Sequence, residues 1–148
     1  MILIDTNVIS EPWKPTPDNQ VLAWIDAQAV ETLFVSAITV AELRFGIAAM
    51  PSGRRKTVLY DRLEQEVLPL FSGRVLSFDM AASQSYSELM ARARVAGRAI
   101  GKTDAYIAAT AAANGFIVAT RDSSPFEAAG LKVINPWYAP TYQRQSVR

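Results

Sequence analysis

Short apolar runs recur along the chain, separated by longer segments with helical periodicity. The first run covers residues 1–4 and ends abruptly at three polar residues, Asp5, Thr6 and Asn7. An apolar run without alternation is typical of a strand buried on both faces, as in a parallel sheet covered by helices. Similar runs occupy residues 33–36, 75–78, 116–119 and 132–134. The pattern therefore predicts a parallel sheet of about five strands.

Apolar residues at helical spacing predict the segments that connect these strands. Long helices are expected over about 17–28, 36–50, 54–68, 79–96 and 103–114, with a short one at 126–129. Strands that alternate with helices indicate an α/β fold in which helices flank the sheet. The chain has no internal repeat, so residues 1–138 are expected to form one domain, followed by a C-terminal tail at 139–148.

Polar residues mark where several of these helices begin or end. Thr16 is the expected cap of the first long helix, and either Ser36 or Thr39 is expected to cap the next one. Asp79 is expected to cap the helix that follows the third strand. Gly115 is expected to end the alanine-rich helix in a left-handed conformation. These capping residues support the predicted helix boundaries.

Composition limits the chemistry available to the chain. Its 148 residues include no cysteine and no histidine, which excludes disulfides, thiolate or imidazole metal ligands, and a Ser-His-Asp arrangement. No apolar run approaches the roughly 18 to 20 residues of a membrane span, and the amino terminus lacks a secretory signal. A cytoplasmic protein without membrane contact is expected. An enzyme with this composition must rely on carboxylates, hydroxyls, basic side chains and a hard metal ion.

Four acids fall at comparable points of the predicted fold. Asp5 ends the first strand, Glu42 lies early in the helix after the second strand, Asp104 lies in the first turn of the alanine-rich helix, and Asp122 follows the fourth strand. In open α/β sheets, the carboxyl ends of the strands are where ligands bind. Two carboxylates about 4 Å apart repel by roughly 4 kcal/mol at an effective dielectric near 20, so a cluster of them favours a bound cation.

Each acid also has an ordinary structural explanation. An aspartate at a strand end often forms a turn with its own backbone, and a glutamate early in a helix is often solvated. Asp104 suits a helix start, and Asp122 is able to cap the short helix that follows it. The combination is what favours a site. Oxygen ligands without His or Cys select Mg²⁺ or Mn²⁺, and such ions assist phosphodiester hydrolysis.

Five sequence motifs together carry a family resemblance. They are ILIDTNVIS at 2–10, SAITVAELRFG at 36–46, KTDAYIAATAAANG at 102–115, VATRDSSPF at 118–126 and INPW at 134–137. In this order they resemble PIN-domain ribonucleases, and more narrowly the VapC toxins of type II toxin–antitoxin pairs, including the FitB type. The resemblance implies a single PIN-like domain and a metal-dependent endoribonuclease.

The same resemblance implies roles for individual residues and partners. Asp5, Glu42, Asp104 and Asp122 would form the acidic cluster that holds Mg²⁺, with Mn²⁺ as a substitute. Thr120 matches a hydroxyl that supports the cluster, and Asn7 matches a polar neighbour of Asp5. The implied partners are an RNA substrate, a cognate antitoxin that also contacts DNA, and a second copy of the chain in a homodimer. One departure is Lys102, which stands where the family commonly has a small residue.

Basic residues supply candidates for RNA contact. If metal neutralises the four acids, 15 basic residues remain against 10 other acidic ones. Such charge tracks a phosphate backbone and carries little sequence information. Arg98, Lys102 and Arg121 are the RNA-binding candidates, whereas the cluster at 54–56 is more typical of a solvated helix start.

The aromatic residues bear on the expected homodimer and antitoxin contacts. Trp13, Trp24, Trp137, Tyr138 and Tyr142 exceed what a small core easily holds, so some of them are expected at an interface.

Other α/β folds with strand-end acids fit less well. A haloacid-dehalogenase phosphatase needs a second aspartate at position 7, which is Asn7. A response-regulator receiver needs adjacent acids after the first strand, and a nucleotide-binding domain needs a glycine-rich phosphate loop. The remaining alternative is a binding module: a toxin-like protein that acts mainly as the non-catalytic partner of a DNA-binding antitoxin in transcriptional regulation.

Overall fold

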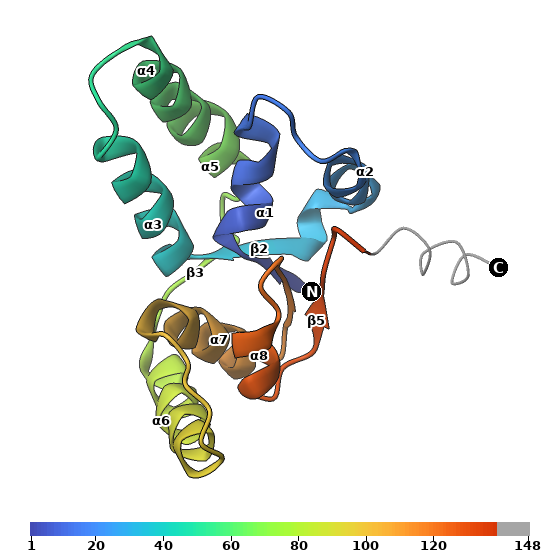
Figure 1. Ribbon diagram of the computed structural model, residues 1–148, viewed down its shortest axis with the longest axis vertical. Helices are drawn as coiled ribbons and strands as arrows, with labels where there is room; N and C mark the ends of the chain where they lie inside the picture. Colours follow the sequence, from blue (N-terminus) through green and yellow to red (C-terminus); the bar gives the residue numbers. More distant parts are fainter. Residues whose placement is uncertain (139–148) are drawn as a thin grey trace, which may run out of the picture.

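The computed structural model describes residues 1–138 and consists of one parallel sheet between two helical layers (Figure 1). The predicted tail at 139–148 lies outside the described residues. The sheet has the order β3-β2-β1-β4-β5, and all four strand pairings are parallel. The five strands are β1 (Ile2–Ile4), β2 (Leu33–Ser36), β3 (Val75–Leu76), β4 (Ile117–Ala119) and β5 (Val133–Ile134). The α/β sheet expected from the sequence is therefore confirmed.

Successive side chains of the central strand enter opposite hydrophobic clusters. Leu3 is fully buried against the layer of α6, α7 and α8, whereas Ile4 faces the cluster that includes α1, α2 and α3. Full burial of a leucine of this kind contributes about 1.5 to 3 kcal/mol. Because helices cover both faces, every position of this strand can be apolar, which explains why the sequence run shows no alternation.

The helices divide between the two faces of the sheet. Figure 1 shows α1 and α3–α5 on one side and α6–α8 on the other. The first layer comprises α1 (Thr6–Ser10), η1 (Glu11–Trp13), α2 (Asn19–Ala27), η2 (Val30–Thr32), α3 (Ala37–Ala48), α4 (Arg54–Asp61), η3 (Arg62–Val67) and α5 (Leu68–Leu70). The second comprises α6 (Met80–Val95), α7 (Lys102–Asn114) and α8 (Ser124–Ala128).

Several helix starts and ends follow the predicted capping residues. Ser36 caps α3 by accepting a hydrogen bond from the backbone N–H of Ile38 at 3.0 Å, which decides between the two residues expected there. Asp79 caps α6, and Gly115 ends α7 with a φ of 68°. The prediction of Thr16 as a cap is wrong. Asp18 caps α2 instead, because its carboxylate stands next to the helix start and accepts from the N–H groups of residues 20 and 21.

One further expectation needs correction. The single helix expected over 54–68 is divided into α4, the π-helical segment η3 and α5, and Pro69 lies in the first turn of the last of these. Among the five aromatic residues of which some are expected at an interface, Trp24 and Trp137 are only 3% and 9% exposed and pack in the same hydrophobic cluster. Tyr138 is 80% exposed, and Tyr142 lies outside the described residues. Within residues 1–138, no helix is both long and apolar enough to span a membrane.

The strand order fixes where a site is expected. From β1 the chain builds outward to β2 and β3 on one side, and then crosses to build β4 and β5 on the other. The order of the strands therefore reverses between β1 and β4. In open α/β sheets, the crevice beyond the carboxyl ends of the two strands at such a reversal is the preferred ligand site.

Candidate functional site

Asp5 lies at the reversal point and is held on both of its carboxylate oxygens. It directly follows β1 and caps α1, with Oδ1 accepting a hydrogen bond from the backbone N–H of Thr6 at 2.8 Å. Oδ2 accepts from the hydroxyl of Thr120 at 2.8 Å. The backbone N–H of Asp5 donates to the carbonyl of Ala119 at 2.9 Å, which ties the ends of β1 and β4 together. Both halves of the sheet therefore position this carboxylate.

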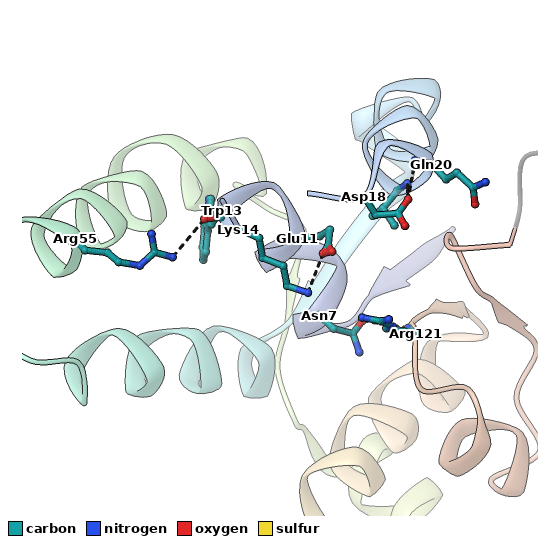
Figure 2. A network of polar contacts seen from close by, with 9 residues as sticks. Asn7, Glu11, Trp13, Lys14, Asp18, Gln20, Arg55 and Arg121 are labelled. Atoms are coloured by element: carbon teal, nitrogen blue, oxygen red, sulfur yellow. Dashed lines mark hydrogen bonds and ion pairs between the residues drawn. The ribbon is translucent and has the colours of Figure 1, made fainter. Parts of the chain in front are cut away.

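The fully buried hydroxyl of Thr120 joins Asp5 to the loop after β4. Its Oγ1 accepts from the backbone N–H of Asp122 at 3.2 Å and from the side-chain amide of Asn7 at 3.4 Å. Asn7 in turn accepts, through Oδ1, from the backbone N–H of Arg121 at 3.2 Å, and Figure 2 shows these two residues side by side. The loop that carries Asp122 is thus attached to the first turn of α1.

Glu42 and Asp104 approach this edge from helices in the two opposite layers. Glu42 lies in α3, and its Oε1 accepts a hydrogen bond from the hydroxyl of Thr6 at 2.7 Å. Asp104 lies in the first turn of α7 and is partly buried. The four acids predicted from the sequence therefore come from four separate elements that meet beyond the carboxyl ends of β1 and β4.

The acids are close enough to perturb one another. Burial raises the pKa of Asp5 above its ordinary value of 3.8, hydrogen bonds from Thr120 and Thr6 lower it, and the charges of Glu42 and Asp122 raise it. Burial also raises the pKa of Asp104, and the charges of Asp5 and Asp122 raise it further. An electrostatic repulsion that links these acids means that they occupy one negative region of the molecule.

The oxygen atoms available in this region are of the chemical type that binds a hard divalent cation. Within residues 1–138 the ion pairs are Lys14–Glu11 and Arg44–Glu64, and neither involves one of the four acids. The available ligands are carboxylate and hydroxyl oxygens, which Mg²⁺ and Mn²⁺ prefer. In the part of the chain that the structure describes, no three acidic side chains are grouped closely enough to hold one ion jointly. Joint ligation therefore requires some of these side chains to rotate.

The three basic residues expected to contact RNA differ in their surroundings. Both Arg98 and Lys102 are exposed; Arg98 lies in the connection between α6 and α7, and Lys102 is the first residue of α7, two positions before Asp104. Arg121 is also exposed, but its guanidinium stacks over the ring of Trp137 at 5.1 Å from the ring centroid. This stacking gives Arg121 a structural contact that its charge alone did not indicate. Their contact with RNA stays a prediction.

Three residues that support the acidic edge did not figure among the predicted site residues. They are Thr6, which contacts Glu42, and Asn135 and Trp137, which hold the loop after β4. The amide of Asn135 donates to the carbonyl of Arg121 at 3.2 Å, and its Oδ1 accepts from the backbone N–H of Trp137 at 3.0 Å. The INPW motif at 134–137 contains Asn135 and Trp137 and was the only indication of their importance in the sequence, but the motif itself suggested no role for them.

Comparison with known proteins gives a consistent set of relatives. Residues 2–131 match the family described as "PIN domain". The chain is 69% identical over 137 residues to VapC ribonuclease Y4jK of Sinorhizobium fredii, covering 93% of this chain and 98% of that protein. It is 50% identical over 138 residues to Toxin FitB of Neisseria gonorrhoeae, covering 93% and 99% respectively. The solved structure of FitAB bound to an IR36 DNA fragment superposes with a TM-score of 0.91 at 48% identity, covering 93% of this chain and 96% of that chain.

Proposed function

Because the chain belongs to the PIN-domain family, within the group of VapC and FitB toxins, we propose that it is a metal-dependent endoribonuclease and the toxin of a toxin–antitoxin pair. The observation that carries the catalytic part is the meeting of Asp5, Glu42, Asp104 and Asp122 at one edge of the sheet. Burial and mutual repulsion raise the pKa of two of these acids, and no basic side chain within residues 1–138 pairs with any of the four.

In this proposal the four acids hold Mg²⁺, for which Mn²⁺ substitutes. When bound, the ion supplies Lewis acidity that favours ionisation of a water molecule and stabilises negative charge on the phosphate. The chain supplies the orientation, because Thr120 and the backbone N–H of Thr6 restrain both oxygens of Asp5. Arg98, Lys102 and Arg121 are proposed to contact RNA phosphates, with Arg121 leaving Trp137 to do so.

The bond changes in hydrolysis follow from the chemistry of a phosphodiester. The water oxygen attacks phosphorus in line with the leaving group, and a carboxylate of the site accepts the proton that this water loses. The bond between phosphorus and the 3′ oxygen breaks, and the 3′ oxygen takes a proton from solvent. The expected products are therefore a 3′ hydroxyl and a 5′ phosphate.

The relatives also support partners for this chain. The name of the FitB relative and the FitAB–DNA complex support a cognate antitoxin that inhibits the ribonuclease, and contact with DNA that is indirect, through that antitoxin. We also propose a homodimer and a cytoplasmic location. The same complex favours the second candidate function, in which the chain acts without catalysis as the partner of a DNA-binding antitoxin.

Cleavage of RNA by the purified chain separates the two functions. We expect the wild-type protein to cut RNA with Mg²⁺, to lose activity in EDTA and to regain it with Mn²⁺. Asp5→Asn and Asp104→Asn should abolish cleavage, whereas Asp61→Asn, which changes an exposed acid on α4, should not. Equal cleavage by wild type and Asp5→Asn would indicate a contaminating nuclease and remove the catalytic claim.

A further inference from the structure

A second, basic hollow lies between η1 and α4, away from the acidic edge. It encloses about 570 Å³ and is lined by Pro12, Trp13, Lys14, Arg54, Arg55, Val58, Leu59 and Arg62. Four of these eight residues are cationic and none is acidic. The Trp13 ring, which is partly buried, forms part of the wall. Cations combined with an exposed aromatic face are typical of grooves that bind single-stranded nucleic acid.

Two of the four cations are held in place from within the protein. Lys14 Nζ lies 3.1 Å from Oε2 of Glu11, whose side chain is only 4% exposed, and Figure 2 shows this pair beside Trp13. Arg55 Nη2 donates to the carbonyl of Trp13 at 3.5 Å. Arg54 and Arg62 are exposed and have no ion pair within residues 1–138. Glu11 neutralises one charge, so the hollow keeps an excess of positive charge directed at solvent.

The hollow and the acidic edge are the two ends of one helical segment. Asp5 caps α1, and α1 continues without interruption into η1, which ends at Trp13. At about 1.5 to 2 Å per residue this segment spans roughly 13 Å. In Figure 2 the same segment leads from Asn7 and Arg121 to the contact between Trp13 and Arg55. A stacked strand advances about 3.4 Å per phosphate, so roughly four nucleotides separate the two sites.

We propose that this hollow is a second substrate subsite, which binds the phosphate backbone of single-stranded RNA about four nucleotides from the scissile bond. Lys14, Arg54, Arg55 and Arg62 contact phosphates there, and Trp13 stacks on one base. The inference rests on the proposed ribonuclease function, which it extends from the reacting phosphate to its neighbours. An acidic protein segment is the competing occupant. RNA is favoured because one continuous helical segment connects the hollow to the cleavage edge, and because four of the residues that line the hollow are cationic and none is acidic.

Salt-dependent binding tests the proposal. All proteins carry Asp5→Asn to prevent cleavage, and the ligand is a fluorescent single-stranded RNA of about 12 nucleotides. The test variant adds Arg54→Gln and Arg62→Gln. The matched control adds Arg92→Gln and Arg94→Gln, which remove two exposed charges from α6 on the opposite face of the sheet. Fluorescence anisotropy gives the affinity for each protein between about 50 and 200 mM salt.

The test variant is expected to bind RNA roughly tenfold or more weakly than the control. The slope of log K against log salt should fall by about 1.4, since each phosphate contact on a single strand contributes about 0.7. Trp13→Leu should weaken binding about fivefold or more through lost stacking, with the salt slope unchanged. Arg54 and Arg62 are exposed, so the charge variant tests the hollow even if Trp13→Leu impairs folding, which circular dichroism reports.

Three results would overturn the proposal. One is an unchanged salt slope in the Arg54 and Arg62 variant. Another is an equal loss of RNA affinity in the Arg92 and Arg94 control variant, which would indicate that RNA binding depends on the general surface charge and not on the hollow. The last is normal RNA binding with lost binding of a labelled poly-glutamate peptide, which would assign the hollow to an acidic protein segment. Gel analysis of the same RNA tests the proposed ribonuclease function separately. Cleavage by Asp5→Asn would contradict the catalytic role of Asp5. The comparison between the two arginine pairs would still show whether RNA binds in the hollow.

Discussion

Replacement of Thr120 by valine tests how the acidic edge is built. Valine keeps the size of threonine but has no hydroxyl. Three hydrogen bonds are lost at a position with no solvent access: the donation to Asp5 at 2.8 Å, and the longer contacts from Asn7 at 3.4 Å and the Asp122 N–H at 3.2 Å. A hydrogen bond to a charged group is worth about 1.5 to 3 kcal/mol, and each longer neutral bond about 0.5 kcal/mol. The expected loss of stability is therefore about 2.5 to 4 kcal/mol.

The substitution should also change the ionisation of Asp5. Burial raises the pKa of Asp5, and the Thr120 hydroxyl is the first of the groups that oppose this effect. Without the hydroxyl, the pKa of Asp5 rises further, and a smaller fraction of the carboxylate is charged at any given pH. The acidic limb of the pH–rate profile for RNA cleavage should therefore move to higher pH, and the metal concentration for half-maximal activity should increase.

Thermal unfolding and cleavage kinetics measure the two effects separately. For a chain of about 150 residues, 1 kcal/mol corresponds to roughly 2 to 4 °C, so Thr120→Val should lower the Tm by about 5 to 15 °C. Thr120→Ser is the matched control, because it keeps the hydroxyl and loses only a methyl group. It should lower the Tm by a smaller amount and leave the acidic limb where it is. If both variants shift the pH profile equally, the hydroxyl does not set the ionisation of Asp5.

Three further predictions concern stability, measured by thermal unfolding. Asp104→Asn in EDTA should raise the Tm at neutral pH by a few degrees at most, because the pKa of Asp104 is raised in the folded protein and its charged form therefore destabilises the fold. This gain in Tm should vanish as the pH falls toward 3.8. A gain that is the same at every pH would contradict this cause. Lys14→Met should reduce the free energy of unfolding by about 1 to 3 kcal/mol, because it leaves the buried carboxylate of Glu11 without its ion pair. Adding Glu11→Gln should restore most of this stability. A double variant as unstable as Lys14→Met would refute the pairing. Gly115→Ala should reduce the stability of the protein by about 1 kcal/mol, because the φ of Gly115 is 68°. Gly46→Ala, within α3, should instead increase the stability by up to about 1 kcal/mol. Equal effects of the two substitutions would exclude backbone conformation as the reason.

The elements of the fold could be predicted from the sequence because each leaves a local pattern. Unalternating apolar runs marked the strands, and Asp79 and Gly115 marked helix ends. The strand order left no such mark, since it depends on which faces pack together. The π-helical segment η3 was also invisible, because its apolar spacing over residues 62–67 resembles that of an ordinary helix. Thr16 and Asp18 are both good capping residues, and only the path of the backbone decides between them.

The candidate site was predictable where residue type and strand ends coincide. Asp5 follows β1 directly and Asp122 lies in the loop just after β4, so the parallel sheet brings them to one edge. The contact between Thr6 and Glu42 depends on how α3 packs beside α1, so it cannot be predicted from the local sequence pattern. The stacking of Arg121 on Trp137 likewise joins residues whose proximity arises from the pairing of β4 with β5.

The pairing of β1 with β4 has a consequence for synthesis of the protein. Thr120, whose hydroxyl contacts Asp5, follows it by 115 positions, and Asp122 lies further on, so Asp5 leaves the ribosome long before either residue. A nascent or prematurely terminated polypeptide that stops before residue 117 lacks β4, which pairs with β1, and also lacks Thr120 and Asp122, one of the four acids. Toxicity is therefore expected to require translation beyond residue 122, which leaves shorter products harmless to the cell that makes them.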